Sequence, residues 1–203
     1  MIITTRQLRG GKIQLFADGE PAAALDSAFW YAQGLLDGDE ITPDALAALI
    51  HEAGLRRAYQ AAITALSHRS YSRKELLDRL LLKQHGREAC EYAVARAQEL
   101  GLLDDADYAA RLAQTLLERK GFSLDRIRAE LSQKGIDREI IENTLENLDN
   151  DPVIRIIELL NTRFAAYNGD EPGKKKVFSA LLRLGYSVND IKTAFRECET
   201  WQN

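Results

Sequence analysis

Residues 131–145 read LSQKGIDREIIENTL, and the same pattern occurs 51 residues earlier and 50 residues later. Residues 80–94 read LLLKQHGREACEYAV, and residues 181–195 read LLRLGYSVNDIKTAF. In each stretch an apolar helical run ends at a short turn, and a second run with helical spacing follows. A period near fifty residues predicts a stack of similar helical units.

The apolar positions of the three copies coincide when the copies are aligned. Four positions are apolar in every copy: Leu76, Leu80, Cys90 and Val94; Ile127, Leu131, Ile141 and Leu145; Val177, Leu181, Ile191 and Phe195. Chance could produce such a match, because apolar residues recur every three or four places in any amphipathic helix. The shared break favours a true repeat, since Gly135 and Gly185 correspond and Gln84 replaces glycine in the first copy.

The predicted unit is a helix, a turn, a second helix and a longer third helix. Residues 69–121 form the first three-helix repeat, residues 122–168 the second, and residues 169–203 a partial third repeat. One unit cannot bury its apolar stripe alone, so neighbouring units must stack. We therefore predict a mainly α fold in which tandem three-helix repeats form an elongated, curved array.

The first 40 residues predict a different structure, a small β-hairpin region followed by a helix. Three runs are strand-like: IITTRQL, IQLFA and EPAAAL. The last two flank the dipeptide Asp18-Gly19, which is a strong hairpin signal, and the first is a possible third strand. A lone hairpin is marginal in water, and a helix over residues 26–37 would cover it. Residues 41–68 predict a connecting helix that begins with Thr42 as N-cap and Pro43 at the first helical position.

Composition restricts the classes of protein to which the chain belongs. The chain has 203 residues and a net charge of −4, and no apolar run approaches the ~18 residues of a membrane span. The start of the chain lacks the apolar stretch of a signal peptide, so we expect a cytoplasmic protein without a membrane partner. Cys90 and Cys198 are predicted to be buried thiols. The three histidines are scattered, so no metal and no cofactor are expected.

No catalytic constellation is present, and we predict that the chain is not an enzyme. The glycine pair in RGGKI (residues 9–13) is not a phosphate-binding loop, because Ile13 stands where Ser or Thr would bind magnesium. Asp104, Asp105 and Asp107 open a predicted helix, where acidic residues cap backbone N–H groups and interact favourably with the helix dipole.

The charges are unevenly distributed and suggest a partner. Residues 69–135 carry thirteen basic and eleven acidic side chains, whereas acidic residues exceed basic ones on either side. This balance fits a protein partner, or one loaded with nucleic acid, better than tight wrapping of bare DNA. The predicted contact residues are the following basic groups: Arg73, Arg79, Lys83, Arg119, Lys120, Arg126, Lys134, Lys174, Lys175 and Lys176. The three lysines at 174–176 open a predicted helix against its dipole, which suggests a negatively charged partner.

Three motifs resemble the RecX family of regulators of the recombinase RecA. They are RSYSRKELLDRLLLK at 69–83, ELGLLDDADYAARLA at 99–113 and RKGFSLDRIRAELSQKGIDREII at 119–141. The chain departs from the family at Lys83-Gln84, where a Lys-Gly turn is common, and this affects the expected geometry of the first turn. The resemblance implies a protein that binds the RecA–single-stranded DNA filament and inhibits its growth, ATPase, strand-exchange and coprotease activities.

Two other functions remain open from the residues. The basic segment 69–87 and the lysine run 174–176 would also suit a stand-alone nucleic-acid-binding protein built from helical modules. A helical stack would serve equally as an adaptor for an unrelated protein. Under the family resemblance, the expected partner is the RecA filament, with single-stranded DNA contacted weakly or through RecA, and the chain is expected to be a monomer.

Overall fold

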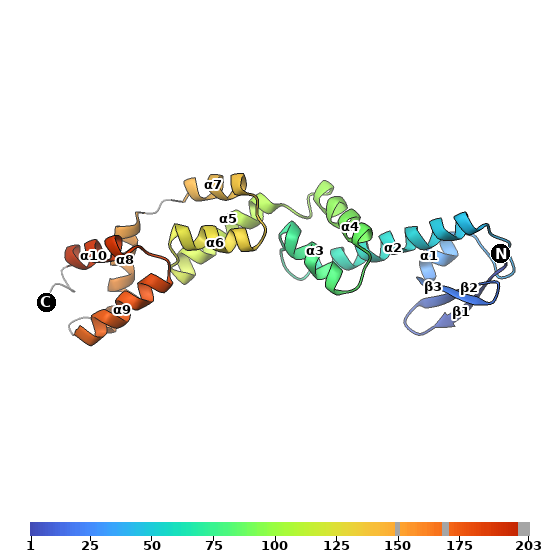
Figure 1. The fold of residues 1–203 in the computed structure, drawn as a ribbon, viewed down its shortest axis with the longest axis horizontal. Helices are drawn as coiled ribbons and strands as arrows, with labels where there is room; N and C mark the ends of the chain where they lie inside the picture. Colours follow the sequence, from blue (N-terminus) through green and yellow to red (C-terminus); the bar gives the residue numbers. More distant parts are fainter. Residues whose placement is uncertain (149–150, 168–170, 199–203) are drawn as a thin grey trace. The chain divides into compact units, whose positions relative to one another are not determined.

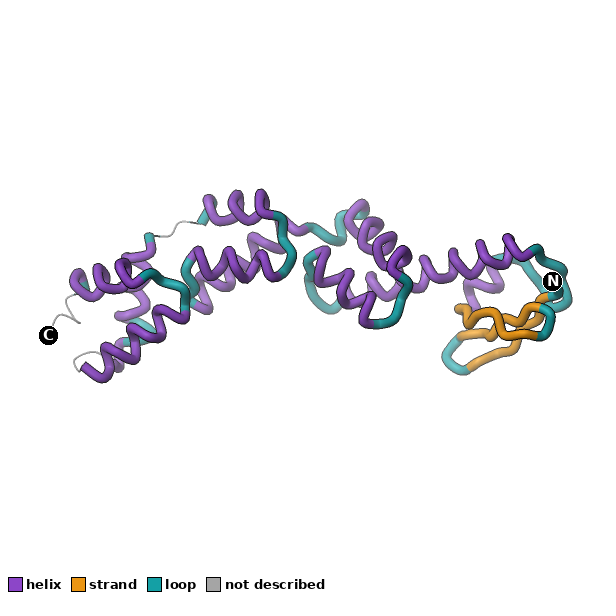
Figure 2. The backbone as a smooth tube through the Cα atoms, in the orientation of Figure 1, coloured by secondary structure: helices purple, strands orange, loops and turns teal. Residues whose placement is uncertain are grey.

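The computed structural model describes residues 1–148, 151–167 and 171–198. The chain divides into two compact units. Unit 1 comprises Met1–Ser70 and Glu75–Leu103, and unit 2 comprises Tyr71–Lys74 and Asp104–Asn203. Figure 2 shows that the strands lie in the N-terminal part of unit 1 and that helices make up most of the remaining chain.

The N-terminal strands form an antiparallel sheet with the order β1-β2-β3. The strands are β1 (Ile3–Leu8), β2 (Lys12–Ala17) and β3 (Glu20–Asp26). Asp18 and Gly19 join β2 to β3, and both have positive φ values, 50° and 83°. Positive φ at both central residues is the backbone conformation that an Asp-Gly hairpin turn requires. The predicted hairpin is therefore confirmed, and the possible third strand is present as β1.

Two helices cover the sheet and supply its core. Helix α1 (Ser27–Ala32) begins where Asp26 accepts hydrogen bonds from the N–H groups of Ala28 and Phe29, at 3.0 and 3.2 Å. Helix α2 (Pro43–Leu66) begins at the predicted cap, where Thr42 Oγ1 accepts the Ala45 N–H at 3.2 Å. The buried cluster joins both helices to alternating strand residues: Ile3, Ile13, Leu15, Leu25, Phe29, Trp30, Leu46 and Leu49.

The rest of the chain is helical (Figure 1). Its elements are α3 (Arg73–Leu82), α4 (Arg87–Glu99), α5 (Asp105–Thr115), the π-helix η1 (Leu116–Lys120), α6 (Leu124–Gln133), α7 (Arg138–Glu146), α8 (Pro152–Asn161), the short 3-10 helix η2 (Ala165–Tyr167), α9 (Glu171–Arg183) and α10 (Val188–Glu197). In the described residues no helix combines the length and the apolar character that crossing a bilayer requires. Cys90 and Cys198 are buried thiols, as predicted.

The aligned apolar positions of the repeat face the protein interior. Eleven of the twelve are buried, and the twelfth, Phe195, is half-buried against the same cluster as Ile191. In each copy the first pair comes from the helix before the turn and the second pair from the helix after it, in α3 and α4, α6 and α7, and α9 and α10. The predicted tandem three-helix architecture is thus present in the structure.

The helices group differently from the predicted boundaries. Helix α5 packs against α7, helix α8 packs against α10, and the second half of α2 packs against α4. The third helix of each predicted repeat therefore opens the next three-helix domain, and α8 completes the third copy. The period of the sequence is the same for either starting point, so periodicity alone does not set the first helix of the unit.

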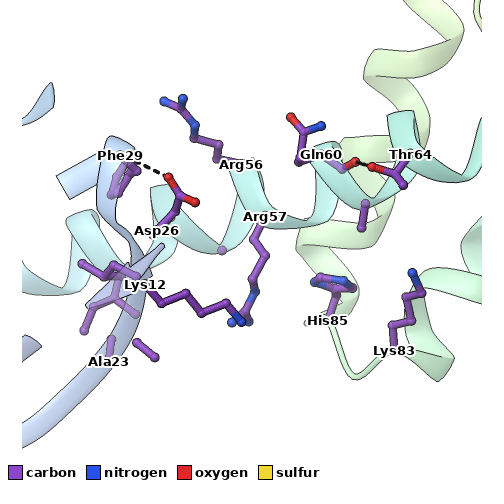
Figure 3. Close-up of a pocket in the computed structure, with 16 residues that line it drawn as sticks. Lys12, Ala23, Asp26, Phe29, Arg56, Arg57, Gln60, Thr64, Lys83 and His85 are labelled. Carbon is purple, nitrogen blue, oxygen red and sulfur yellow. Dashed lines mark hydrogen bonds between the residues drawn. The ribbon is translucent and has the colours of Figure 1, made fainter. Parts of the chain in front are cut away.

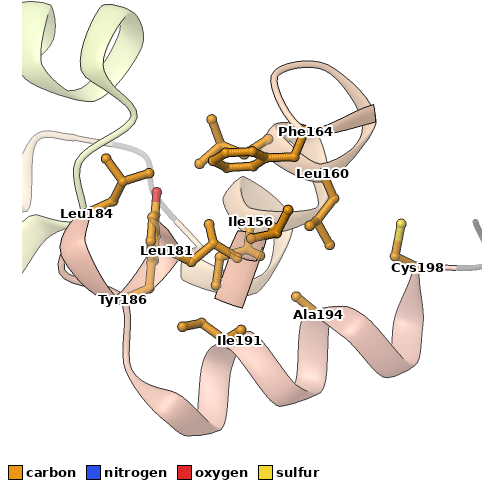
Figure 4. Packing of buried hydrophobic residues seen from close by; sticks show 11 residues of the cluster. Ile156, Leu160, Phe164, Leu181, Leu184, Tyr186, Ile191, Ala194 and Cys198 are labelled. Atoms are coloured by element: carbon orange, nitrogen blue, oxygen red, sulfur yellow. The ribbon is translucent and has the colours of Figure 1, made fainter. Parts of the chain in front are cut away.

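The third domain shows how one such unit is filled (Figure 4). Ile156 and Leu160 of α8 meet Leu181 of α9 and Ile191 of α10, and each of these side chains is fully buried. Tyr186 lies in the same cluster, 3% exposed. Its hydroxyl group has no hydrogen-bond partner of normal geometry among the described residues. Burial raises the pKa of Tyr186 to about 12, although the Arg155 guanidinium acts in the opposite direction.

The turn inside each domain uses the left-handed backbone region. Gly135 and Gly185 have φ values of 74° and 96°, and Gln84 has a φ of 61°. The departure from glycine in the first copy therefore leaves the turn geometry intact. Glycine is needed at position 135 for a second reason: a Cβ placed there would come within 2.5 Å of Lys74 Cβ, and it would also clash with Lys74 Cδ. The side chain of Gln84 is instead exposed.

Candidate cationic interface

The ten predicted contact residues are divided between the two units. Arg79 and Lys83 belong to unit 1, and the other eight belong to unit 2. All ten side chains are exposed or half-buried. The structure alone does not assign them to a partner, and they remain predictions.

Helix α3 presents the first pair as expected. Leu76 and Leu80 are fully buried, which fixes the rotation of the helix about its axis. Arg79 is exposed on the helix, and Lys83 is exposed just beyond its last residue, Leu82. Residues four positions apart lie on one side of a helix, so the two cations form a short stripe.

Lys83 has cationic neighbours that the sequence did not reveal. It lines a cleft of about 810 Å³ in unit 1 together with Lys12, Arg56, Arg57 and His85 (Figure 3). These residues come from a strand, a long helix and the turn after α3, so no local motif links them. In the sequence, the adjacent pair Arg56-Arg57 is the signal that could have indicated this cluster, and both arginines line the cleft.

The second group surrounds the π-helix η1 in unit 2. Arg119 and Lys120 are exposed at its end. Its carbonyl groups accept hydrogen bonds from two further arginines: Arg155 Nη2 donates to Leu117 O at 2.8 Å, and Arg163 Nη1 donates to Lys120 O at 2.9 Å. Guanidinium groups stabilise the unpaired carbonyls at a helix C-terminus. Sequence reasoning missed this pair because the donors lie 38 and 43 residues away.

Three other predicted contacts have structural partners. Arg126 pairs with Glu130 at 2.8 Å, and its guanidinium lies 5.5 Å from the centre of the Phe122 ring. Lys134 is half-buried, and its carbonyl accepts the Ser72 hydroxyl at 2.6 Å. The side chain of Arg73 is exposed, while its backbone N–H donates to Asp105 Oδ1 at 2.8 Å. These groups stabilise the fold whether or not they also meet a partner.

The lysine run at 174–176 lies further inside its helix than predicted. Helix α9 begins at Glu171, so Lys174, Lys175 and Lys176 lie beyond the first helical position, behind an acidic residue in the first turn. The effect of the helix dipole falls off within the first turn. The predicted electrostatic conflict is therefore weaker than expected, and the three lysines remain predicted contacts.

The acidic residues at the start of α5 act as caps. Asp104 Oδ1 accepts the N–H groups of Ala106 and Asp107 at 2.8 and 3.1 Å. Asp105 accepts the N–H of Arg73, and its partial burial raises the pKa of its carboxyl group. Within the described residues, no three side chains of the His, Cys, Asp or Glu type converge to hold a metal ion.

Family comparisons identify the helical domains. The model described as "RecX, first three-helix domain" matches residues 58–96, and the model described as "RecX, second three-helix domain" matches residues 104–145. A protein named "Regulatory protein RecX" from Finegoldia magna is 30% identical, over 75% of this chain and 77% of that protein. This chain belongs to the RecX family.

Other RecX proteins match over nearly the whole chain. The protein of the same name from Caldanaerobacter subterraneus subsp. tengcongensis is 27% identical, over 96% of this chain and 98% of the relative. A crystal structure of regulatory protein RecX superposes with a TM-score of 0.66 at 22% identity, over 97% of this chain and 99% of that chain. RecX from Lactobacillus salivarius gives a TM-score of 0.59 at 24% identity, over 72% of this chain and 97% of that one. These structural matches support the fold.

The RecX domain boundaries agree with the observed helix packing. The first domain model starts at residue 58, inside α2, and the second starts at residue 104, just before α5. The second RecX domain therefore begins with α5, which we had placed at the end of the first repeat, and the first begins inside the helix that we had predicted as a connector.

Proposed function

We propose that this chain is a non-enzymatic regulator that binds the RecA–single-stranded DNA filament and inhibits RecA's recombinase, ATPase and coprotease activities. Membership of a family whose members are named regulatory proteins carries the proposal. The exposed cations on α3, η1 and α9 support it, because they can contact an acidic protein surface or the phosphates of a filament.

The direct test is RecA's DNA-dependent hydrolysis of ATP with this protein added below equimolar amounts. Inhibition well below one protein per RecA monomer is expected, because a regulator of a filament affects many subunits from one site. An unchanged hydrolysis rate at every ratio would remove the proposal. Strand exchange and coprotease assays under the same conditions extend the test to the other activities.

Charge reversal at α3 tests the contact residues. The variant Arg79→Glu/Lys83→Glu changes two exposed side chains and should keep the fold. We expect its affinity for the RecA filament to fall about tenfold or more, because opposite charges become like charges at the contact. The matched control is Arg87→Glu/Arg96→Glu on α4, which makes the same change in net charge at exposed positions. Equal loss in both variants would indicate a long-range effect of net charge and would remove α3 from the contact surface.

The alternative is a stand-alone nucleic-acid-binding protein. The exposed cations of both units favour it, since phosphate contacts need only accessible Lys and Arg groups. Gel-shift titrations without RecA, at low and physiological salt, separate the two functions. Tight, sequence-specific binding would support the alternative, whereas weak binding that disappears with salt agrees with regulation through RecA.

A further inference from the structure

The cleft in unit 1 is built from segments far apart in the chain. Lys12 and residues 23–26 contribute from the sheet and its end, Phe29 from α1, and residues 50–64 from one face of α2. Lys83 and His85 close it from the turn after α3. Figure 3 shows His85 and Lys83 beside α2, with Arg57 extending from that helix between them and the sheet. Its volume of about 810 Å³ is typical of a small-molecule site.

The lining of this cleft is strongly cationic in a chain whose net charge is negative. Lys12, Arg56, Arg57 and Lys83 face a single carboxylate, Asp26. That carboxylate is already used, because it caps the first N–H groups of α1. In the parts of the chain that the structure describes, Lys12, Arg57 and Lys83 form no ion pair. The cleft therefore holds four cationic side chains and one carboxylate, which leaves an excess of positive charge.

The positive charges of the cleft also act on His85, which lines it. Its pKa lies below the ordinary value, first because of partial burial and then because of the positive charges of Arg57 and Lys83. Unpaired cations that repel one another favour the binding of an anion, which relieves the repulsion.

The remaining walls suit a ligand with an apolar part. Apolar side chains line the sheet and α2 sides of the cleft: Ala23, Ala24, Leu25, Ile50, Ala53 and Ala61. Gln60 adds an amide group, and Thr64 adds a hydroxyl group that donates to Gln60 O at 2.8 Å. A free phosphate would use the cations and leave the apolar wall uncovered. A flat heteroaromatic base joined to phosphate would use both.

We propose that this cleft binds a nucleotide, with the phosphate groups among Lys12, Arg57 and Lys83 and the base against the apolar wall of β3 and α2. The inference does not rest on the proposed function, because it concerns binding by this chain alone. A free nucleotide and one nucleotide of a single strand share this chemistry, and the test distinguishes them.

The test is a titration of a fluorescent nucleoside triphosphate into the full-length protein, followed by anisotropy. We expect saturable binding that Arg57→Glu and Lys83→Gln each weaken about tenfold, the effect of losing one charge-assisted hydrogen bond. Arg87→Glu is the matched control for Arg57→Glu, because Arg87 is exposed on α4 outside the cleft. Circular dichroism of each variant checks that the fold is retained.

Competition experiments identify the ligand. Inorganic tripolyphosphate should compete at least about tenfold less well than the nucleotide, because it lacks the base. If a short oligothymidylate displaces the fluorescent nucleotide at lower concentration than free nucleotide does, the cleft binds a single strand. If free nucleotide displaces it at lower concentration, the cleft binds a free nucleotide. Both results support the proposal. Absence of saturable binding, equal effects of Arg57→Glu and Arg87→Glu, equal competition by tripolyphosphate, or tighter competition by an oligoglutamate peptide would each overturn it.

Discussion

Replacing Gly135 by alanine tests the physical basis of the repeat. The backbone at Gly135 has a φ of 74°, a region that costs an L-residue about 1–2 kcal/mol. The new methyl group would also lie within 2.5 Å of Lys74 Cβ and 3.0 Å of Lys74 Cγ. Overpacking of this kind costs about 1–3 kcal/mol. The two contributions predict that unit 2 loses about 2–5 kcal/mol of its free energy of unfolding.

Gly101→Ala provides the matched control. Gly101 has a similar φ of 67°, but a Cβ there would meet nothing within 4 Å. Its replacement should therefore cost unit 1 only the backbone contribution of about 1–2 kcal/mol. A second comparison uses Lys74→Ala, which removes Lys74 Cγ and Cδ but keeps Cβ. In that background Gly135→Ala should cost less than in the natural sequence.

Native-state hydrogen exchange is the appropriate assay, because the two units need not unfold together. The slowest amides of α6 and α7 report unit 2, and those of α4 report unit 1. The reasoning fails if Gly135→Ala costs no more than Gly101→Ala, or if the Lys74→Ala background leaves the cost of Gly135→Ala unchanged. Either result would mean that close approach to Lys74 does not explain glycine in this turn.

Three further predictions concern single side chains. Gln84→Gly should raise the free energy of unfolding of unit 1 by up to about 1 kcal/mol in a urea titration, because glycine removes most of the left-handed strain at φ 61° and part of the gain is offset by chain entropy; a loss of stability would contradict this. His85 has a lowered pKa in the folded protein, so the unfolded chain binds more protons below pH 6.5 and stability should fall as the pH falls through that value. His85→Gln should remove this fall in thermal melts, and an unchanged pH profile would count against the charge environment of Arg57 and Lys83. Tyr186→Phe should abolish a loss of roughly 2–3 kcal/mol in the free energy of unfolding between pH 10 and about 12, where the unfolded phenol ionises and the folded one does not; an unchanged alkaline profile in thermal melts would contradict this.

The fold was largely predictable because helix periodicity and capping are local signals. Ser123, Asp137 and Asp151 cap their helices through N–H groups two or three residues away, and such short-range contacts are visible in sequence. The start of α9 was harder to predict, since Pro172 and Gly173 suggest a break. Proline is tolerated in the first turn of a helix, where its missing N–H has no partner to lose, and the helix begins at Glu171.

The candidate sites were less predictable. Arg79 and Lys83 could be assigned to an exposed stripe, because the buried positions Leu76 and Leu80 fix the orientation of α3. The cluster around Lys83 could not be assigned, because Lys12 and Arg57 approach it through the packing of the sheet on α2. A charge pattern in sequence identifies exposed cations, but it does not show which of them converge on one ligand.

The sequence by itself determined the helical repeat, the hairpin at its start and the apolar residues of each domain, because these depend on side-chain spacing and on contacts within a few residues. Only the tertiary structure decided which helix opens each domain, because a periodic pattern has no intrinsic starting point. The packing of α5 against α7 places α5 at the start of the second domain. It also decided why the second turn must be glycine and which cations share the cleft, because both follow from contacts between segments distant in the chain.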